Sequence, residues 1–138
     1  MKIGAQVKKI VVAAVAVLTL SHASHAEERH ALHGLFCNAE AQLEQTLGHL
    51  RLGLSPQLAA EATNGRSVVC VHADRIRYVV IRPVILGQVR HRGILLMKYS
   101  ATLVGVDVGR NVRPVEPDLP IFFLSGDRIP GAVLSGNA

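Results

Sequence analysis

Apolar residues recur at helical spacing in the first part of the chain. Six of them follow at intervals of three or four residues, which places them on one stripe of a helix: Phe36, Ala39, Leu43, Leu47, Leu50 and Leu54. We expect Asn38 to cap this helix and Gly53 to end it. A second, shorter helix should follow, because Ser55 can cap it and Pro56 suits a first helical turn. The pattern predicts a helical hairpin over residues 38–64.

After Gly65 the chain becomes rich in β-branched residues. Candidate strands lie at 67–72, 76–81, 84–89, 94–108 and 121–124. The connection at 90–93 ends in Gly93 and is typical of a β-hairpin. We expect a bulge near Gly105 and an irregular stretch across the prolines at 114, 117 and 120. Such short connections join antiparallel neighbours, because a parallel crossover needs a dozen or more residues.

The order of elements, helices first and strands afterwards, favours an α+β fold. We expect an N-terminal helical hairpin packed on an antiparallel sheet, or on a small partly closed β-barrel, of about five strands. The pattern leaves sheet and barrel open. We predict a single domain over residues 35–125. A mobile tail is expected at 27–34, which is short, polar and unpatterned, and a flexible Gly-rich tail at 126–138.

The chain length and the N-terminus bear on where the protein acts. The 138 residues, 49% of them hydrophobic, suit one ordinary domain and exclude a disordered or multi-pass membrane chain. Residues 1–26 have the three parts of a secretory signal peptide: early lysines, an apolar run at 10–20, and small residues before a cut between Ala26 and Glu27. That run is shorter than the about 20 residues of a spanning helix, which favours cleavage over a retained anchor. We expect a periplasmic or secreted bacterial protein without a transmembrane segment after cleavage.

Removing the signal changes the charge. Three of the 15 basic residues lie in the first 26, so 12 remain against 10 acidic residues, and the net charge falls from +5 to +2. The high overall basicity therefore overstates the case for a nucleic-acid partner. The chain also lacks tryptophan, which disfavours stacking on bases or sugars. We expect no nucleic-acid binding.

The two cysteines, Cys37 and Cys70, have one intrachain pairing available. Export would place them where disulfides form and persist. A bond between them would close a loop of about 34 residues, worth roughly 3–4 kcal/mol in the chain-entropy model. The alternatives are a metal pair, a reactive thiol or two buried free thiols. Without a CxxC spacing, a structural disulfide is the favoured interpretation.

Motifs for catalysis and cofactor binding are missing from the sequence. It contains no GxSxG, HExxH, GxxxxGK[ST] or GxGxxG motif. His30 and His33 have HxxH spacing, but in an expected tail they make a poor zinc site. Cys70 and His72 would share a strand face, yet the disulfide gives Cys70 a better use. We therefore assign no catalytic, cofactor-binding or metal-binding residue.

Asp107 lies in an apolar strand, where a carboxylate must be exposed or paired. We expect Arg77 or Arg82 to pair with it across the sheet rather than a catalytic role.

Clustered arginines are the remaining feature. Arg90, His91 and Arg92 crowd one turn, while Arg110 and Arg113 flank another. Together they are candidates for anion binding, but charged loop tips also keep sheets from pairing with one another. Consecutive hairpin turns point to opposite ends of a sheet, which separates the two clusters by a strand length of roughly 17–20 Å or more. We therefore expect no strong anion site.

These observations favour a small exported protein without catalytic activity. We expect a protein-interaction module with an unknown protein partner in the cell envelope. The first alternative is weak binding of anionic envelope polymers by the arginine-rich hairpins. The second is a small periplasmic hydrolase.

Overall fold

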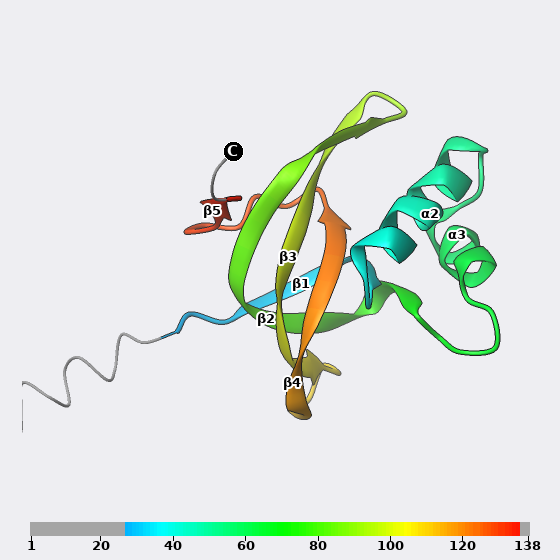
Figure 1. The fold of residues 1–138 in the computed structure, drawn as a ribbon. Helices are drawn as coiled ribbons and strands as arrows, with labels where there is room; N and C mark the ends of the chain where they lie inside the picture. The colour runs from blue at the N-terminus through cyan, green and yellow to red at the C-terminus, as the bar shows by residue number, and fades with distance from the viewer. Residues whose placement is uncertain (1–26, 136–138) are drawn as a thin grey trace, which may run out of the picture.

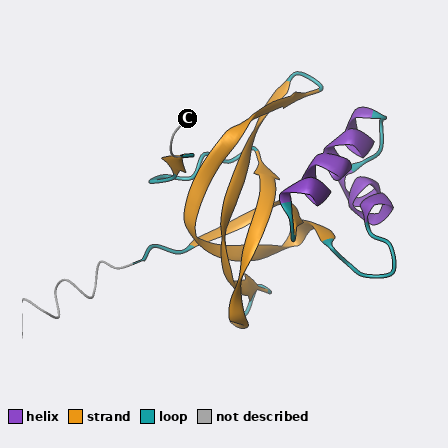
Figure 2. Cartoon of the chain, in the orientation of Figure 1, coloured by secondary structure: helices purple, strands orange, loops and turns teal. Residues whose placement is uncertain are grey.

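Two helices stand beside a five-stranded sheet in the computed structural model, which describes residues 27–135 (Figures 1 and 2). The elements follow in the order β1 (His30–Cys37), α2 (Glu40–Arg51), α3 (Pro56–Thr63), β2 (Cys70–His91), β3 (Ile94–Asp107), β4 (Val112–Ser125) and β5 (Val133–Leu134). The expected signal peptide, up to Ala26, lies outside the described residues, which begin at Glu27. The α+β class is confirmed.

The strands lie in the order β1-β4-β3-β2-β5, and β1 also pairs with β2. All pairs are antiparallel except the parallel pair of β2 with the short β5. The sheet is therefore mixed, and it curls because β1 contacts both β2 and β4. It does not form a clear barrel. The helical hairpin is not N-terminal as expected, because β1 precedes it.

Strand β1 replaces most of the tail expected at residues 27–34. Leu35 lies opposite His72 of β2 and also opposite Leu124 of β4, so β1 is paired on both sides. Neither partner is close in sequence, and the short polar stretch before Leu35 gives no local signal of a strand. Phe36, which we expected on the helical stripe, belongs to β1 instead.

The sheet separates two apolar cores, because neighbouring side chains on a strand point to opposite faces. Leu35 faces the helices and packs with Leu43, Leu47 and Leu50 of α2. Phe36 points the other way, into the concave face of the curled sheet, where it packs with Tyr99 and other apolar residues. A shift of one residue in β1 would exchange these two sets, so the register is strongly specified.

The two helices form largely as expected. The buried stripe of α2 is Leu43, Leu47 and Leu50, joined by Thr46. Its N-terminal cap is Ala39 rather than Asn38, and the backbone N–H of Ala39 donates to the Gln42 side chain at 3.1 Å. In α3 the Ser55 hydroxyl accepts a hydrogen bond from Leu58 N, with Pro56 in the first turn.

The strands are longer than the sequence pattern indicated. The expected link at 73–75 is part of β2, a continuous strand of 22 residues that begins at Cys70. Its register shifts between Ile81 and Val84, around Pro83. The hairpin at 90–93 and the bulge next to Gly105 are confirmed.

Strand β4 runs through the expected irregular region. Pro114 and Pro120 lie where β4 pairs with β3 only, since β1 reaches no further than 122–124, and Pro117 lies in a bulge at 115–118 without partners on β3. A proline lacks the N–H of a central strand and is tolerated at such an edge.

The segment after β4 packs on the sheet, although we expected a flexible tail at 126–138. The buried Tyr99 hydroxyl donates to the Asp127 carbonyl at 3.0 Å and accepts from Ile129 N at 3.3 Å. Ile129 is buried, and Ser135 N donates to Ile85 O next to β5. Residues 136–138 lie outside the described part. Between residues 27 and 135, no helix has both the length and the apolar character to cross a membrane.

Candidate functional site

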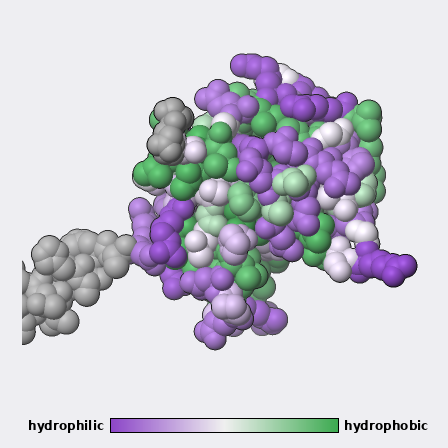
Figure 3. Space-filling view, viewed as in Figure 1, coloured by the Kyte–Doolittle hydropathy of each residue, from purple (hydrophilic) through white to green (hydrophobic). Residues whose placement is uncertain are grey.

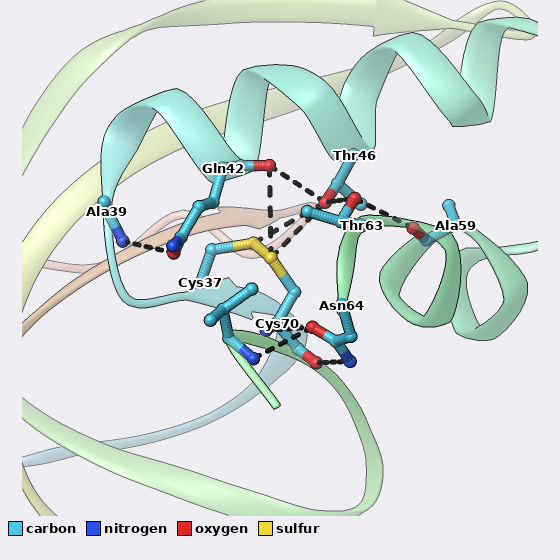
Figure 4. Close-up of a disulfide and its surroundings, with 9 residues drawn as sticks. Cys37, Ala39, Gln42, Thr46, Ala59, Thr63, Asn64 and Cys70 are labelled. Atoms are coloured by element: carbon cyan, nitrogen blue, oxygen red, sulfur yellow. Dashed lines mark hydrogen bonds between the residues drawn. A yellow bond between two sulfur atoms is a disulfide. The ribbon is translucent and has the colours of Figure 1, made fainter. Parts of the chain in front are cut away.

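A disulfide between Cys37 and Cys70 joins the end of β1 to the start of β2, as predicted (Figure 4). The two cysteines are directly opposite each other in the antiparallel pair, and both are buried. Thr46 of α2 lies over the bond, with its hydroxyl 3.4 Å from Cys70 Sγ and 2.5 Å from the Thr63 hydroxyl of α3. The disulfide is thus the point where both helices meet the sheet.

Asn64 fixes the chain as it leaves α3 and enters β2. Its side-chain oxygen accepts hydrogen bonds from Val69 N at 2.9 Å and Cys70 N at 2.8 Å, and its amide donates to the Cys70 carbonyl at 3.0 Å (Figure 4). The expected helix end at Asn64 therefore also positions the second cysteine.

A two-stranded arm projects from the sheet at the far end of β2. We define this arm as residues 86–96. Strand β5 pairs with β2 only at Val84 and Ile85, and β4 pairs with β3 only from Met97 onward. Among the residues described, the ends of β2 and β3 beyond these points pair only with each other (Figure 1). The arm turns at Arg92 and Gly93, with φ of 51° and 78°.

An apolar hollow of about 170 Å³ lies between the arm and the helices. Its walls are aliphatic side chains from four different elements, with two imidazoles and a glycine beside them: Leu35, Leu50, Leu96, Leu124, His72, His91 and Gly126. The volume is below the roughly 300–1,000 Å³ that is usual for small organic ligands. The hollow has the size and character to receive one apolar side chain of a partner.

A second hollow, of about 440 Å³, opens between α3 and β2 on the other side of His72. It is polar, and its walls include Glu61, Asp74 and Arg75. Asn64 and Cys70 also contribute to it, but both are already engaged in the contacts around the disulfide. Between residues 27 and 135, no three His, Cys, Asp or Glu side chains are grouped as a metal site requires.

Lys98 anchors α2 to the sheet beside the apolar hollow. Its side chain is 13% exposed, and its ammonium group contacts Glu40 at 2.7 Å as well as Glu44. Burial lowers the pKa of Lys98, but the hydrogen bonds to the two carboxylates outweigh burial and raise the pKa above its usual value. The ion pairs therefore tie the N-terminal part of α2 to β3.

The two arginine clusters lie at opposite ends of β3. Arg90, His91 and Arg92 are at the tip of the arm, whereas Arg110 and Arg113 surround the turn between β3 and β4 (Figure 1). The 14 residues of β3 separate them by roughly 40 Å along the strand, at about 3.3 Å per residue. The structure does not bring these five candidate anion-binding residues together.

Asp107 is paired with Arg77, one of the two partners expected. Arg77 Nη2 donates to Asp107 Oδ2 at 2.6 Å, and Gly109 N donates to the other carboxylate oxygen at 2.9 Å. The hydrogen bond from Gly109, followed by that from Arg77, lowers the pKa of the Asp107 carboxyl below its usual value. The carboxylate thus stabilises the turn between β3 and β4.

Known proteins give no further guide. No protein-family model, curated protein or solved structure matches this chain. What the chain binds must therefore be argued from its own surfaces.

The sequence predicted the hairpin at 90–93, but neither its projection as an arm nor the apolar hollow. The hollow combines residues from β1, α2, β3 and β4, which nothing in the sequence brings together. The arm does have a signal in the sequence. Two apolar residues, Ile94 and Leu95, directly follow the basic turn, and both are exposed, at 62% and 43%.

Proposed function

We propose that this protein is an exported, non-catalytic interaction module that binds a protein partner in the cell envelope. The observation that carries the proposal is the apolar hollow between the arm and the helices, which suits one apolar side chain. Binding energy at protein interfaces is concentrated where a few such anchors fill desolvated pockets. The two histidines beside the leucines would supply a polar rim.

Export is supported by two independent features. The first 26 residues have the pattern of a signal peptide. The buried disulfide at the junction of sheet and helices suits an oxidising compartment, where such bonds persist. The partner would therefore be a periplasmic or cell-surface protein.

The hollow can be blocked by filling it. At Gly126 an added Cβ would lie 3.9 Å from Leu96 Cδ2, an ordinary contact, so Gly126→Met should place its side chain in the hollow without strain. Gly48→Met is the matched control, because Gly48 is exposed on α2 and an added Cβ would meet nothing within 4 Å. Both variants should unfold at denaturant concentrations no lower than the wild type.

The test is site-specific photo-crosslinking in the native envelope. A photoreactive residue at His91, on the rim of the hollow, should give one discrete crosslinked product. A photoreactive residue at Arg110, at the opposite end of β3, should not give this product. Gly126→Met should abolish the His91 product and Gly48→Met should retain it. Identical products from both positions, or a His91 product that survives Gly126→Met, would show that the hollow is not the binding surface.

A further inference from the structure

The tip of the arm exposes apolar side chains on both of its faces. Ile94 and Leu95 are adjacent on β3, so they point to opposite sides of the two-stranded arm. Ile94 lies opposite His91, and Leu95 lies opposite Arg90. A partner protein with a flat surface would bury the apolar side chain on only one face of the arm. A fluid layer that the tip enters end-on would bury the apolar side chains on both faces.

The surroundings of these apolar residues are basic. Between Pro83 and Val106 the chain has three basic residues besides His91, namely Arg90, Arg92 and Lys98, and no Asp or Glu. Arg90, His91 and Arg92 lie at the tip itself, and Arg128 lines a hollow together with Leu95. Glu40 and Glu44, on the neighbouring helix, are already paired with Lys98. The surface that complements this tip is anionic.

The shape of the arm allows the tip to reach beyond the body of the protein. Val89 is buried with the core beneath the helices, so the part of the arm that projects is its tip, from Arg90 to Leu95. Figure 3 shows hydrophilic residues gathered at the end of the molecule where the arm projects in Figure 1. An interfacial element buries its apolar side chains about 5–10 Å into the boundary between headgroups and acyl chains. Ile94 and Leu95 at the turn are the side chains that would be buried to this depth, and His91, which also lines the apolar hollow, lies beside them.

We propose that the tip of the arm binds the surface of an anionic lipid bilayer. Arg90 and Arg92 contact the lipid phosphates, while Ile94 and Leu95 enter the boundary with the acyl chains. The separation of the two arginine clusters argues against a strong anion site built from both. It does not affect this proposal, because here the apolar pair, rather than a second cluster, complements the arginines. The inference does not depend on the proposed protein partner, although His91 borders both the tip and the apolar hollow.

Insertion can be followed by fluorescence, because the natural chain contains no tryptophan. Ile94→Trp should shift its emission to shorter wavelength with vesicles of phosphatidylcholine and phosphatidylglycerol. Vesicles of phosphatidylcholine alone should give a much smaller shift. Val112→Trp is the control, because Val112 is about half exposed at the opposite end of β3. It should show no shift with either vesicle.

Charge variants test the arginines. Arg90→Gln/Arg92→Asn should weaken binding to the anionic vesicles about 10–30-fold at low salt, as expected for two arginines near such a surface. Asn is compatible with the positive φ at residue 92, so this turn should stay folded. Arg110→Gln/Arg113→Gln removes the same charge from the other end of β3 and should leave binding nearly unchanged. Ile94→Ser/Leu95→Ser should also weaken binding.

Three results would overturn the proposal. The first is equal vesicle binding by the two double arginine variants, which would indicate attraction by net charge alone. The second is an unshifted tryptophan emission from the Ile94→Trp variant on vesicles that do bind the protein. The third is binding of a soluble polyphosphate or an acidic protein by the tip without binding to vesicles, which would identify a different ligand for the same charges.

Discussion

Phe36 packs its ring between those of Tyr78 and Phe123, with centroids 4.5 and 4.7 Å away. The next contact, from Phe123 to Tyr99, continues this aromatic row across the concave face of the sheet. Aromatic pairs at such distances add to the energy of burial alone. Burial in this row also raises the pKa of the Tyr78 hydroxyl. On the opposite face of the sheet, the leucines of α2 stabilise the fold through the apolar area that they bury and through close packing.

A substitution at Leu47 tests the core between the sheet and the helices. Leu47 is 2% exposed, so Leu47→Ala should lower the free energy of unfolding by about 2–5 kcal/mol, through lost burial and a residual cavity. Leu52→Ala is the matched control on the same helical hairpin. Leu52 is 80% exposed, and its replacement should change stability by no more than about 0.5 kcal/mol. Chemical denaturation of both variants measures the difference, and equal losses would mean that α2 does not pack as described.

Asp107 gives a pH-dependent prediction. Its pKa is lower in the folded chain than in the unfolded chain, because Gly109 and Arg77 donate hydrogen bonds to the ionised carboxylate. Its stabilising effect is therefore complete above the unfolded pKa and is lost as pH falls through the folded pKa. Asp107→Asn should be less stable than the wild type at pH 7, and the gap should narrow on acidification. Denaturation curves at several pH values would measure it, and a gap independent of pH would contradict this role.

Among the elements, the helices were predictable because their signals are local. Ser55 caps α3 and the leucine stripe of α2 is buried, as their spacing indicates. Strand β1 was not predictable, because its extended conformation depends on hydrogen bonds with β2 and β4, which lie 30 or more residues away in the sequence. The same cause explains β2, where the apparent link at 73–75 is extended because Ala73 lies opposite Gly34.

In the turn of the arm, the residue type at position 92 does not suit the backbone conformation there, and this can be tested. Arg92 has a φ of 51°, a left-handed conformation that disfavours most side chains, and Gly93 follows with 78°. An Asn-Gly pair is the preferred sequence for a two-residue hairpin turn with positive φ at both positions. Arg92→Asn should therefore raise the free energy of unfolding, by up to about 1 kcal/mol. Arg90→Asn, in the neighbouring strand, should not stabilise, and a loss with Arg92→Asn would mean that the turn has another geometry.

At the scale of the whole molecule, the sequence predicted the disulfide, the hairpin and the separation of the arginine clusters. Each of these follows from residue types and short spacings. Two cysteines allow one disulfide, a turn that ends in glycine indicates a hairpin, and consecutive hairpin turns lie at opposite ends of a sheet. The apolar hollow did not follow, since Leu50, Leu96 and Leu124 come together only through the packing of α2 on the sheet. A binding surface assembled from distant segments needs the fold before it can be described.

Export and folding should be linked through the disulfide. The protein recovered from the periplasm should begin at Glu27, three residues before β1, and should have Cys37 bonded to Cys70. Intact mass and non-reducing peptide mapping would measure both. A chain that begins at Glu27 and is retained in the reducing cytoplasm should keep free thiols. Its free energy of unfolding should be lower by about 3–4 kcal/mol and should recover on oxidation.

The double variant Cys37→Ser/Cys70→Ser is the control for this experiment. Since it has no disulfide to form, its stability should be the same from either compartment and close to that of the reduced wild type. The sequence separation of 33 residues sets the size of the effect, because the bond restricts a loop of that length in the unfolded chain. A full-length wild-type chain in the cytoplasm would refute the export proposal. Equal stability of the oxidised and reduced wild type would instead show that the packing around Thr46 and Asn64 suffices to join the helices to the sheet.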